Sequence, residues 1–258
     1  MITAFESLFD LETAKQTNLL ISGANHSGKT LLACGIASVL NKLGYKVIVL
    51  DVSGKWKEVS DLPYYSIVQK KRNELVYAEL PSSGIYDLSL LKLSHAKTIV
   101  EMVANRLWND AISEVDPEYT WLFYEEAEGT LRNIRGNASE AVFRLIHIGR
   151  NVNIRGVLIT TDLALLDASV IRLCGIRFHG FLNVEENSKR KFRHYYGKEW
   201  TEVANDSLKV GDFIRLHDRT IDVIHVPEFK SSHIPQQWPT AHYVRRQDQK
   251  GFFSRLFG

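Results

Sequence analysis

The feature that most constrains the fold is an eight-residue stretch that matches G-x-x-x-x-G-K-T, Gly23-Ala24-Asn25-His26-Ser27-Gly28-Lys29-Thr30. A short apolar run precedes it, and the small and apolar residues of 31–40 follow with the character of a packed helix. Successive backbone N–H groups in such a loop can point at phosphate oxygens, and the helix N-terminus adds partial positive charge. The stretch therefore predicts a phosphate-binding loop between a buried strand and a helix, rather than a chance Gly-Lys-Thr at a turn.

The residue types of the loop also predict its ligands. Lys29 is expected to reach the terminal phosphates of a nucleotide, and Thr30 to offer its hydroxyl to a magnesium ion. ATP and Mg²⁺ are therefore the expected cofactors. The expected nucleotide-contacting residues are Gly23, Ala24, Asn25, His26, Ser27, Gly28, Lys29, Thr30 and Leu31.

Composition excludes several classes of protein. The 258-residue chain is 45% hydrophobic, and 32 basic residues are balanced by 30 acidic ones, so any nucleic-acid contact must come from local patches. The N-terminal residues lack the pattern of a signal peptide, and no apolar run is long enough to span a bilayer. We therefore expect a soluble, intracellular protein. Cys34 and Cys174 are expected to be buried thiols, and the histidines lack metal-ligand spacing.

Strand-like and helix-like segments alternate along the chain, which predicts an α/β fold with a mainly parallel sheet flanked by helices. The expected strands of the core are 19–22, 46–51, 121–124, 156–162 and 175–182, with a C-terminal β-hairpin formed by 211–216 and 221–226. Helices are expected within 31–40, 88–111, 137–150 and 167–173. Residues 52–88, with short strands at 64–68 and 75–80, are interpreted as an insertion beside the core. Asp51 is expected to cap the turn that follows its strand.

A second diagnostic feature is the stretch Trp121-Leu122-Phe123-Tyr124-Glu125-Glu126, in which four bulky residues precede two carboxylates. Such a strand is buried on both faces, and its carboxyl end emerges beside the phosphate loop. We assign Glu125 to the metal, partly through water, and Glu126 to the base that activates the attacking water. Alone, this pattern also describes a solvated strand end. At the end of the fourth strand, Thr161 or Asp162 is a candidate sensor of the terminal phosphate.

The order of these parts resembles the FtsK/HerA branch of P-loop ATPases. The resemblance rests on the loop 23–30, the strand ending Tyr124-Glu125-Glu126-Ala127, Gly149-Arg150 shortly before 156–162, and the final strand 208–214. It implies a RecA-like fold of the additional-strand, catalytic-glutamate type. It also implies a ring-forming motor that moves double-stranded DNA, most similar to genome-packaging ATPases of tailless viruses. Location in the cytoplasm or with a virion would follow.

The chain departs from the usual pattern of that branch at two positions. Glu125-Glu126 stands where the family usually has Asp-Glu, which keeps the charges and lengthens the metal ligand. Thr161-Asp162 stands where Thr-Gln is common, and a carboxylate there would repel a phosphate unless a metal or base intervened.

A ring, most often a hexamer in this family, gives an arginine a role in the neighbouring subunit's site. By the resemblance, Arg150 is the candidate, and as a third catalytic residue beside Lys29 and Glu126 it would stabilise charge on the transferred phosphoryl group. Arg144 and Arg155 are the competing positions, and a surface ion pair is the alternative for all three.

Two stretches are candidates for contact with DNA. Residues 189–196 interleave basic and aromatic side chains, which suits phosphate neutralisation and base stacking. Arg132 and Arg135 follow the paired carboxylates on a Gly-containing loop and are the alternative.

The chain is expected to divide into an N-terminal extension (1–18), a P-loop ATPase domain (19–230) and a C-terminal tail (231–258). The tail ends in an apolar group at helical spacing, which can fold back or dock on a neighbouring subunit, portal, capsid or membrane. Two functions are consistent with the whole pattern: a DNA-translocating ATPase, or an ATPase that drives protein assembly or secretion, as in filamentous-phage export. A small-molecule kinase fits less well because it has no use for paired acids that activate water.

Overall fold

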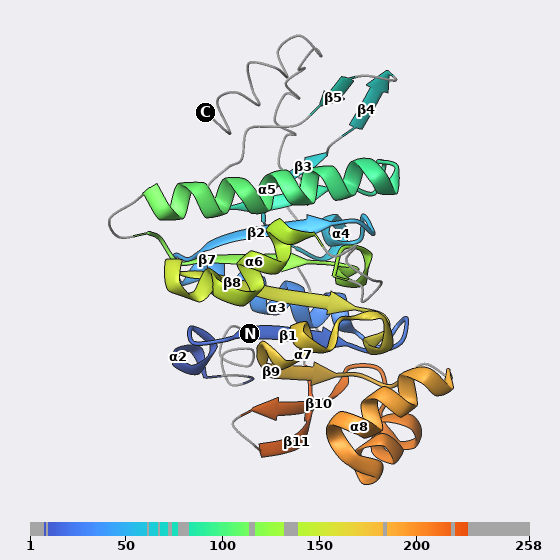
Figure 1. Cartoon of the computed structure of the whole chain (residues 1–258). Helices are drawn as coiled ribbons and strands as arrows, with labels where there is room; N and C mark the ends of the chain where they lie inside the picture. Colours follow the sequence, from blue (N-terminus) through green and yellow to red (C-terminus); the bar gives the residue numbers. More distant parts are fainter. Residues whose placement is uncertain are drawn as a thin grey trace.

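The computed structural model describes residues 8, 10–60, 62–66, 68–71, 74–76, 83–113, 117–131, 139–182, 185–217 and 220–226. In these residues a single sheet dominates, in the strand order β11-β10-β9-β1-β8-β7-β2-β6-β3 (Figure 1). Its strands are β1 (Asn18–Ser22), β2 (Lys46–Asp51), β3 (Tyr64–Ser66), β6 (Gly84–Asp87), β7 (Thr120–Tyr124), β8 (Ile154–Thr160), β9 (Cys174–His179), β10 (Asp212–His217) and β11 (Thr220–His225). The strands from β9 to β3 run parallel, and β10 and β11 form an antiparallel hairpin at one edge.

The position of β8 in the sheet determines which of the loops that follow the strands are neighbours. It lies between β1, which leads into the glycine-rich loop, and β7, which leads into the paired carboxylates. The expected additional strand is therefore present. Because all three strands are parallel, their carboxyl ends lie at the same end of the sheet, and the loops that follow them are neighbours.

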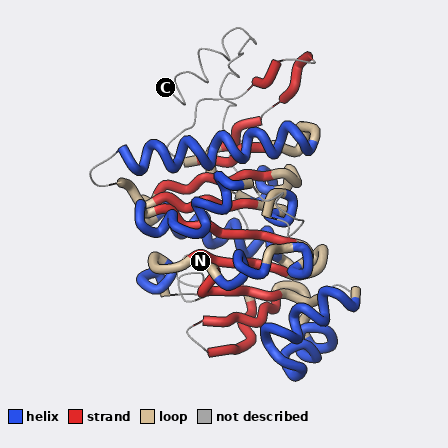
Figure 2. The backbone as a smooth tube through the Cα atoms, viewed as in Figure 1, coloured by secondary structure: helices blue, strands red, loops and turns tan. Residues whose placement is uncertain are grey.

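Helices cover both faces of the sheet, as the tube in Figure 2 shows. The helix α3 (Lys29–Lys42) packs on one face, where Leu19 and Ile21 of β1 point, whereas Leu20 points to the other face. That other face is covered by α5 (Leu93–Ser113), α6 (Glu140–Ile148), α7 (Ala168–Arg172) and α8 (Glu186–Glu202). Burial on both faces explains why the central strands are continuous apolar runs.

Shorter elements complete the described chain: the helices α2 (Leu11–Ala14) and α4 (Trp56–Val59), a separate β4 (Val68–Lys71) and β5 (Glu74–Val76) hairpin, the 3₁₀ turns η1 (Ala127–Gly129), η2 (Gly149–Val152) and η3 (Leu163–Leu165), and a π-helical turn η4 (Val203–Ser207).

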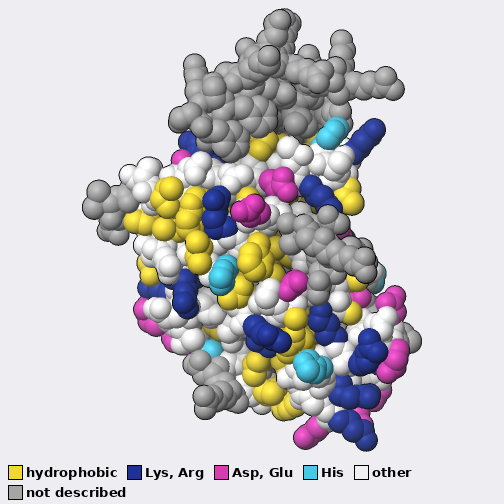
Figure 3. Space-filling model, viewed as in Figure 1, with side chains coloured by type: hydrophobic (Ala, Val, Ile, Leu, Met, Phe, Trp, Pro, Cys, Tyr) yellow, Lys and Arg dark blue, Asp and Glu magenta, His cyan; other side chains and the backbone are white. Residues whose placement is uncertain are grey.

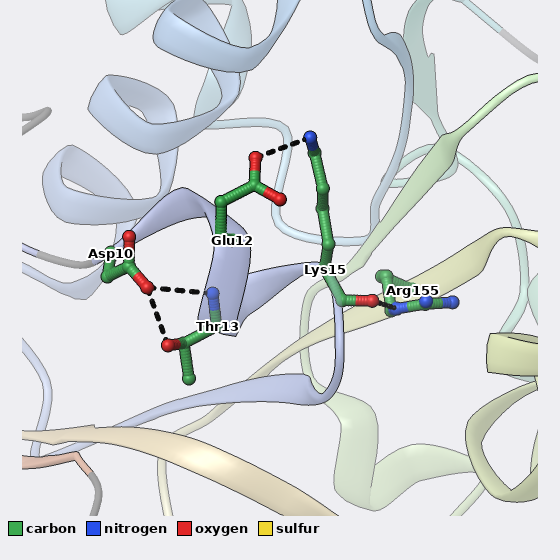
Figure 4. Close-up of polar contacts among 5 residues, drawn as sticks. All are labelled: Asp10, Glu12, Thr13, Lys15 and Arg155. Atoms are coloured by element: carbon green, nitrogen blue, oxygen red, sulfur yellow. Dashed lines mark hydrogen bonds and ion pairs between the residues drawn. The ribbon is translucent and has the colours of Figure 1, made fainter.

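The chain before β1 is fastened to the amino end of the sheet (Figure 4). Asp10 caps α2 by accepting hydrogen bonds from Thr13 N at 2.9 Å and Thr13 Oγ1 at 2.6 Å. Lys15 Nζ pairs with Glu12 Oε1 at 2.8 Å, and the carbonyl oxygen of Lys15 accepts a hydrogen bond from Nε of the buried Arg155 on β8. Capping and a buried guanidinium therefore hold this segment in place.

Most expected elements are found within a few residues of their predicted bounds, and two differences stand out. The buried strand β6 was not predicted, and both β6 and β3 extend the main sheet, so part of 52–88 belongs to the sheet itself. The helix α8 was not predicted as a helix. The division into three regions stays a prediction, because the tail 231–258 and residues 77–80 lie outside the described residues.

Three smaller expectations concern single residues and membrane spans. Asp51 caps the turn after β2, as expected, by accepting hydrogen bonds from the backbone N–H groups of Ser53, Gly54 and Trp56. Cys34 and Cys174 are buried, as expected, and do not form a disulfide with each other. Within the described part of the chain, no helix has the length and apolar character needed to cross a bilayer.

Candidate nucleotide-hydrolysis site

The glycine-rich loop joins the carboxyl end of β1 to the first turn of α3. Gly28 is the N-cap of α3 and has a φ of 98°, a left-handed conformation that side chains disfavour. At Gly23, with a φ of 149°, a Cβ atom would lie 2.8 Å from Ser27 Oγ and 3.1 Å from the Cα of Gly180. These two positions therefore require glycine, one for its backbone conformation and the other also for close packing against the loop after β9.

Lys29 lies against the backbone of this loop. Its side chain is buried, and its Nζ donates a hydrogen bond to the carbonyl oxygen of Ala24 at 2.8 Å. Burial lowers the pKa of the Lys29 ammonium to about 8, because the charged form loses hydration. An anionic phosphate in the loop would compensate for that loss. The lysine is therefore held next to the place where a nucleotide's phosphates would bind.

Glu125 follows β7 and reaches the same loop. Its Oε1 accepts a hydrogen bond from Thr30 Oγ1 at 3.1 Å, and its Oε2 accepts hydrogen bonds from Ser53 Oγ at 2.8 Å and Trp56 Nε1 at 2.9 Å. Burial, reinforced by the negative charge of Asp51, raises the pKa of Glu125 to about 7. Three side chains, from α3, the turn after β2 and α4, thus hold one buried carboxylate whose negative charge is disfavoured by burial and by Asp51.

The contact between Thr30 and Glu125 fits a magnesium ion. Magnesium takes oxygen ligands in octahedral geometry, and ligands at about 2.0–2.1 Å leave neighbouring oxygens about 2.9 Å apart. The two side-chain oxygens are 3.1 Å apart, close to that spacing. A cation here would also relieve the repulsion between Glu125 and Asp51. Thr30 and Glu125 would hold the metal, and the described residues contain no cluster of three or more His, Cys, Asp or Glu side chains that offers another site.

Glu126 has a different environment from its neighbour. It adopts a left-handed backbone conformation (φ 52°, ψ 48°), which is uncommon for a residue other than glycine, and its side chain is exposed. Partial burial, followed by repulsion from the nearby Glu128, raises the pKa of Glu126. The strained turn thus presents a carboxylate of increased basicity to the cavity next to the metal-ligand candidates.

The candidate sensor residues separate in the structure. Thr161 lines the cavity, and its Oγ1 donates a hydrogen bond to Glu128 Oε1 at 2.8 Å. Asp162 Oδ1 instead accepts hydrogen bonds from Ala164 N at 2.8 Å and Ser188 Oγ at 2.6 Å, so that it caps η3. This explains how a carboxylate is tolerated where the related family commonly has glutamine. The sensor hypothesis therefore rests on Thr161.

The three candidate arginines also separate. Arg144 donates a hydrogen bond to Asn105 and lies over the ring of Trp108, and Arg155 is buried at the amino end of β8. Arg150 lies exposed in η2, and among the described residues no hydrogen bond or ion pair of its side chain is found. Because β8 separates η2 from the cavity by seven residues, about 20 Å of strand, Arg150 cannot reach the cavity of the same chain.

The cavity has a volume of about 450 Å³ and gathers these groups at the carboxyl end of the sheet. Sequence reasoning expected several of its lining residues: Asn25, His26, Gly28, Lys29, Thr30, Leu31, Glu125, Glu126 and Thr161. It missed others, namely Ser53, Lys55, Ile159, Thr160 and Val210, together with Trp56 and Glu128, which hold Glu125 and Thr161. The missed residues come from the end of β8, from short turns and helices and from the distant loop before β10, and no motif marks them.

The two DNA-contact candidates have different outcomes. Residues 189–196 form most of the first part of α8, which lies near the carboxyl end of β9 (Figure 1). Arg132 and Arg135 lie outside the described residues.

No protein-family profile and no curated protein matches the chain. Solved structures do match. B204, the DNA-packaging ATPase of Sulfolobus Turreted Icosahedral Virus, aligns with a TM-score of 0.61 and 18% identity over 83% of this chain and 98% of that one. The genome packaging NTPase B204 from Sulfolobus turreted icosahedral virus 2, in complex with ATP-gammaS, aligns at 0.60 and 17% identity over the same shares. VirB4 of Thermoanaerobacter pseudethanolicus aligns at 0.58 and 10% identity, over 84% of this chain and 90% of that one.

At these identities the likeness concerns the fold. It agrees with the fold that the glycine-rich loop and the strand order predict, and with the resemblance to the FtsK/HerA branch. The chain thus has the fold of these P-loop ATPase structures.

Proposed function

We propose that the protein is an ATP-hydrolysing motor that translocates or packages double-stranded DNA as a ring. The observation that carries the proposal is the arrangement at β7: Glu125 contacts the loop threonine, and Glu126, in a left-handed turn, faces the same cavity. A site that only bound nucleotide would have no use for a second, strained carboxylate beside the metal ligands.

Each group then has a distinct part in hydrolysis. The loop amides and Lys29 would bind the β- and γ-phosphates, and Thr30 and Glu125 would hold a magnesium ion, which would neutralise the charge of the phosphate oxygens. Glu126 orients a water molecule in line with the γ-phosphate and accepts its proton, for which its raised pKa is an advantage. Thr161 contacts the γ-phosphate from the end of β8.

Assembly into a ring, with six subunits as the expected number, supplies the remaining group. Arg150 is exposed and lies at the opposite end of β8 from its own cavity, so it can serve only a neighbouring subunit. A guanidinium supplied in this way stabilises the charge of the transferred phosphoryl group. Sedimentation velocity with and without ATP measures the number of subunits.

The moved substrate is proposed from the fold. The B204 structures belong to packaging proteins and resemble this chain over nearly their whole length. The second candidate is an ATPase that drives protein assembly or secretion. The fold is also similar to that of VirB4, so the fold alone does not decide between the two candidates.

The ATPase rate with and without duplex DNA tests the proposal. The expected result is hydrolysis that requires Mg²⁺ and increases severalfold with duplex DNA, with a smaller increase for single strands. Hydrolysis that is unaffected by any nucleic acid would favour the protein-moving candidate. No hydrolysis in any condition would contradict both.

A further inference from the structure

The helix α8 carries a group of basic side chains that the hydrolysis site does not use. Residues 189–193 hold four basic residues and no acidic one, whereas the acidic residues of α8 lie in its first turn and beyond Gly197. In Figure 3, Lys and Arg side chains gather with acidic ones at the lower right, where Figure 1 places α8. The composition alone does not distinguish a binding surface from a solvated face.

The contacts of the individual side chains make that distinction. Lys191 Nζ donates hydrogen bonds to the carbonyl oxygens of Ala164, at 3.1 Å, and Leu166, so its charge is used inside the domain. Lys189, Arg190 and Arg193 have no ion pair among the described residues, and both arginines are exposed. Three positive charges thus lie within a stretch of about 6 Å along the axis of α8, with no acidic partner in the described chain.

The same helix is hydrogen-bonded to the strand that leads into the phosphate loop. Tyr196 Oη lies 2.6 Å from His179 Nε2, and His179 Nδ1 lies 2.6 Å from Oγ of Ser22, the residue directly before Gly23. Arg177 donates a further hydrogen bond to Tyr196 Oη at 3.2 Å. All three members of this chain of side chains are buried. Buried, fully bonded networks of this kind fix relative positions more tightly than apolar contacts do.

Two further contacts join α8 and its continuation to the cavity. Ser188 Oγ donates a hydrogen bond to Asp162, the residue after the sensor candidate Thr161. After η4, the N–H of Gly211 donates a hydrogen bond to the carbonyl oxygen of Ser27 at 3.2 Å, and the adjacent Val210 lines the cavity. A displacement of α8 would therefore shift β1, the turn after β8 that contains Thr161 and Asp162, and the phosphate loop.

We propose that Lys189, Arg190 and Arg193 on α8 bind the phosphate backbone of duplex DNA, and that the Tyr196–His179–Ser22 hydrogen bonds couple this contact to the phosphate loop. The inference rests on the proposed DNA motor and adds its contact surface and route of coupling. A backbone contact fits these residues because arginine forks bind phosphate oxygens in pairs, and a motor must hold DNA of any sequence.

The first test removes charge from α8. Arg190→Ala/Arg193→Ala is compared with Lys92→Ala/Lys97→Ala, which removes the same charge from the start of α5, on the same face but toward the opposite edge of the sheet. For the α8 variant we expect unchanged basal ATPase activity, at least tenfold weaker duplex binding and a slope of log K against log salt that is shallower by about 2. The α5 variant should match wild type. An unchanged salt slope in the α8 variant overturns the assignment.

The second test separates coupling from binding. Tyr196→Phe removes one hydroxyl and keeps the ring, and Tyr195→Phe makes the same change next to it. We expect Tyr196→Phe to bind duplex DNA as wild type does while losing most of the DNA stimulation of ATPase activity, with Tyr195→Phe unaffected. Full stimulation in Tyr196→Phe overturns the coupling. A purely structural role would instead lower basal activity and stability together.

The outcomes also separate this inference from the proposed function. If wild type shows no stimulation by DNA, the DNA motor itself fails, and the inference fails with it. If wild type is stimulated and the α8 variant behaves identically, only the inference fails. If polyglutamate binds wild type as tightly as duplex DNA does, and Arg190→Ala/Arg193→Ala loses both, the surface serves an acidic protein and the assignment to DNA is wrong.

Discussion

The two ends of the central sheet each bury a charged side chain, but in different surroundings. At the amino end, Arg155 is buried, but it donates hydrogen bonds to the carbonyl oxygens of Lys15 and Ile154 and lies over the ring of Tyr119. At the carboxyl end, burial raises the pKa of Glu125 to about 7, and the negative charge of Asp51 adds to the effect. Both buried charges have hydrogen-bond partners, and burial also lowers the pKa of Arg155, but only Glu125 lies beside a buried charge of its own sign, that of Asp51.

The difference shows which end is built for a ligand. Burial of a charge is tolerated when partners replace the lost hydration, as around Arg155. At the carboxyl end Glu125 has hydrogen-bond donors, but the positive charge that would offset Asp51 would come from a magnesium ion bound with nucleotide. Stability should therefore depend on the amino end, and turnover on the carboxyl end. Arg150 is the exception, because it lies at the amino end and is proposed to act in a neighbour's site.

That exception carries the largest expected effect. Arg150→Ala should lower turnover about a thousandfold, because the charge of the transferred phosphoryl group loses its guanidinium. Nucleotide affinity, measured with a fluorescent ATP analogue, should stay close to that of wild type. Mixing Arg150→Ala subunits with subunits carrying Glu126→Gln should restore part of the activity, since some interfaces then combine two intact groups. Equal loss of binding and turnover would rule out action in trans.

At the carboxyl end, Glu125→Gln should separate turnover from stability. Turnover at fixed Mg²⁺ should fall about a hundredfold, since metal-ion stabilisation contributes several kcal/mol to catalysis. The unfolding free energy should stay the same or rise, because a buried carboxylate beside Asp51 is replaced by a neutral amide of similar shape. Urea unfolding monitored by tryptophan fluorescence measures it. A clear loss of stability would show that Glu125 is structural, and the comparison between the two ends would then break.

At the amino end, Arg155→Met should do the reverse. The unfolding free energy should fall by about 2 kcal/mol, because buried carbonyl oxygens lose their donor. ATPase activity per folded molecule should be unchanged. Arg106→Met, at an exposed arginine that pairs with Asp110, is the control and should change stability by less than about 1 kcal/mol. Lost activity in a still-folded Arg155→Met protein would show that the amino end also serves the reaction.

The smallest effect concerns the pH dependence of stability at His179. Burial, with a contribution from the charge of Arg177, lowers the pKa of His179 to about 3, below the value of about 6.5 in an unfolded chain. Between these values the unfolded chain binds a proton that the folded chain does not, so stability is lost as pH falls below 6.5. His179→Gln lacks this loss. Its deficit in unfolding free energy relative to wild type should shrink between pH 7 and pH 5 by up to about 1.4 kcal/mol per unit. A constant deficit would contradict the assignment.

Much of the fold could be predicted because its signals are local. The glycine-rich loop, the apolar run before Glu125 and the alternation of strands and helices each depend on neighbours in sequence. Together they were sufficient to predict a mainly parallel sheet and to predict that the loop and Glu125 meet, whereas the additional strand was expected only from the resemblance to the FtsK/HerA branch. The structure places Thr30 and Glu125 in direct contact, 95 residues apart in sequence.

The parts that were missed depend on distant packing. α8 contains Gly197 in a left-handed conformation and a basic surface, so its helical pattern is weak, and its core residues Phe192 and Tyr196 are recognisable only once His179 is seen beside them. In the sequence Trp56 is indistinguishable from any other apolar residue, whereas in the structure its Nε1 donates a hydrogen bond to Glu125. In the sequence Asp162 is a sensor candidate, whereas in the structure its carboxylate accepts a hydrogen bond from Ser188. Such roles arise from partners that no local pattern identifies.

The central claim is that Glu126 activates water at a nucleotide held by the loop, and one measurement tests it most directly. Purified wild type and Glu126→Gln are incubated with γ-labelled ATP, Mg²⁺ and duplex DNA, and both bound nucleotide and released phosphate are followed. We predict that Glu126→Gln keeps intact ATP bound while its phosphate release falls by at least about a hundredfold. A variant that releases phosphate at the wild-type rate, or a wild type that neither hydrolyses nor retains ATP, would contradict the account.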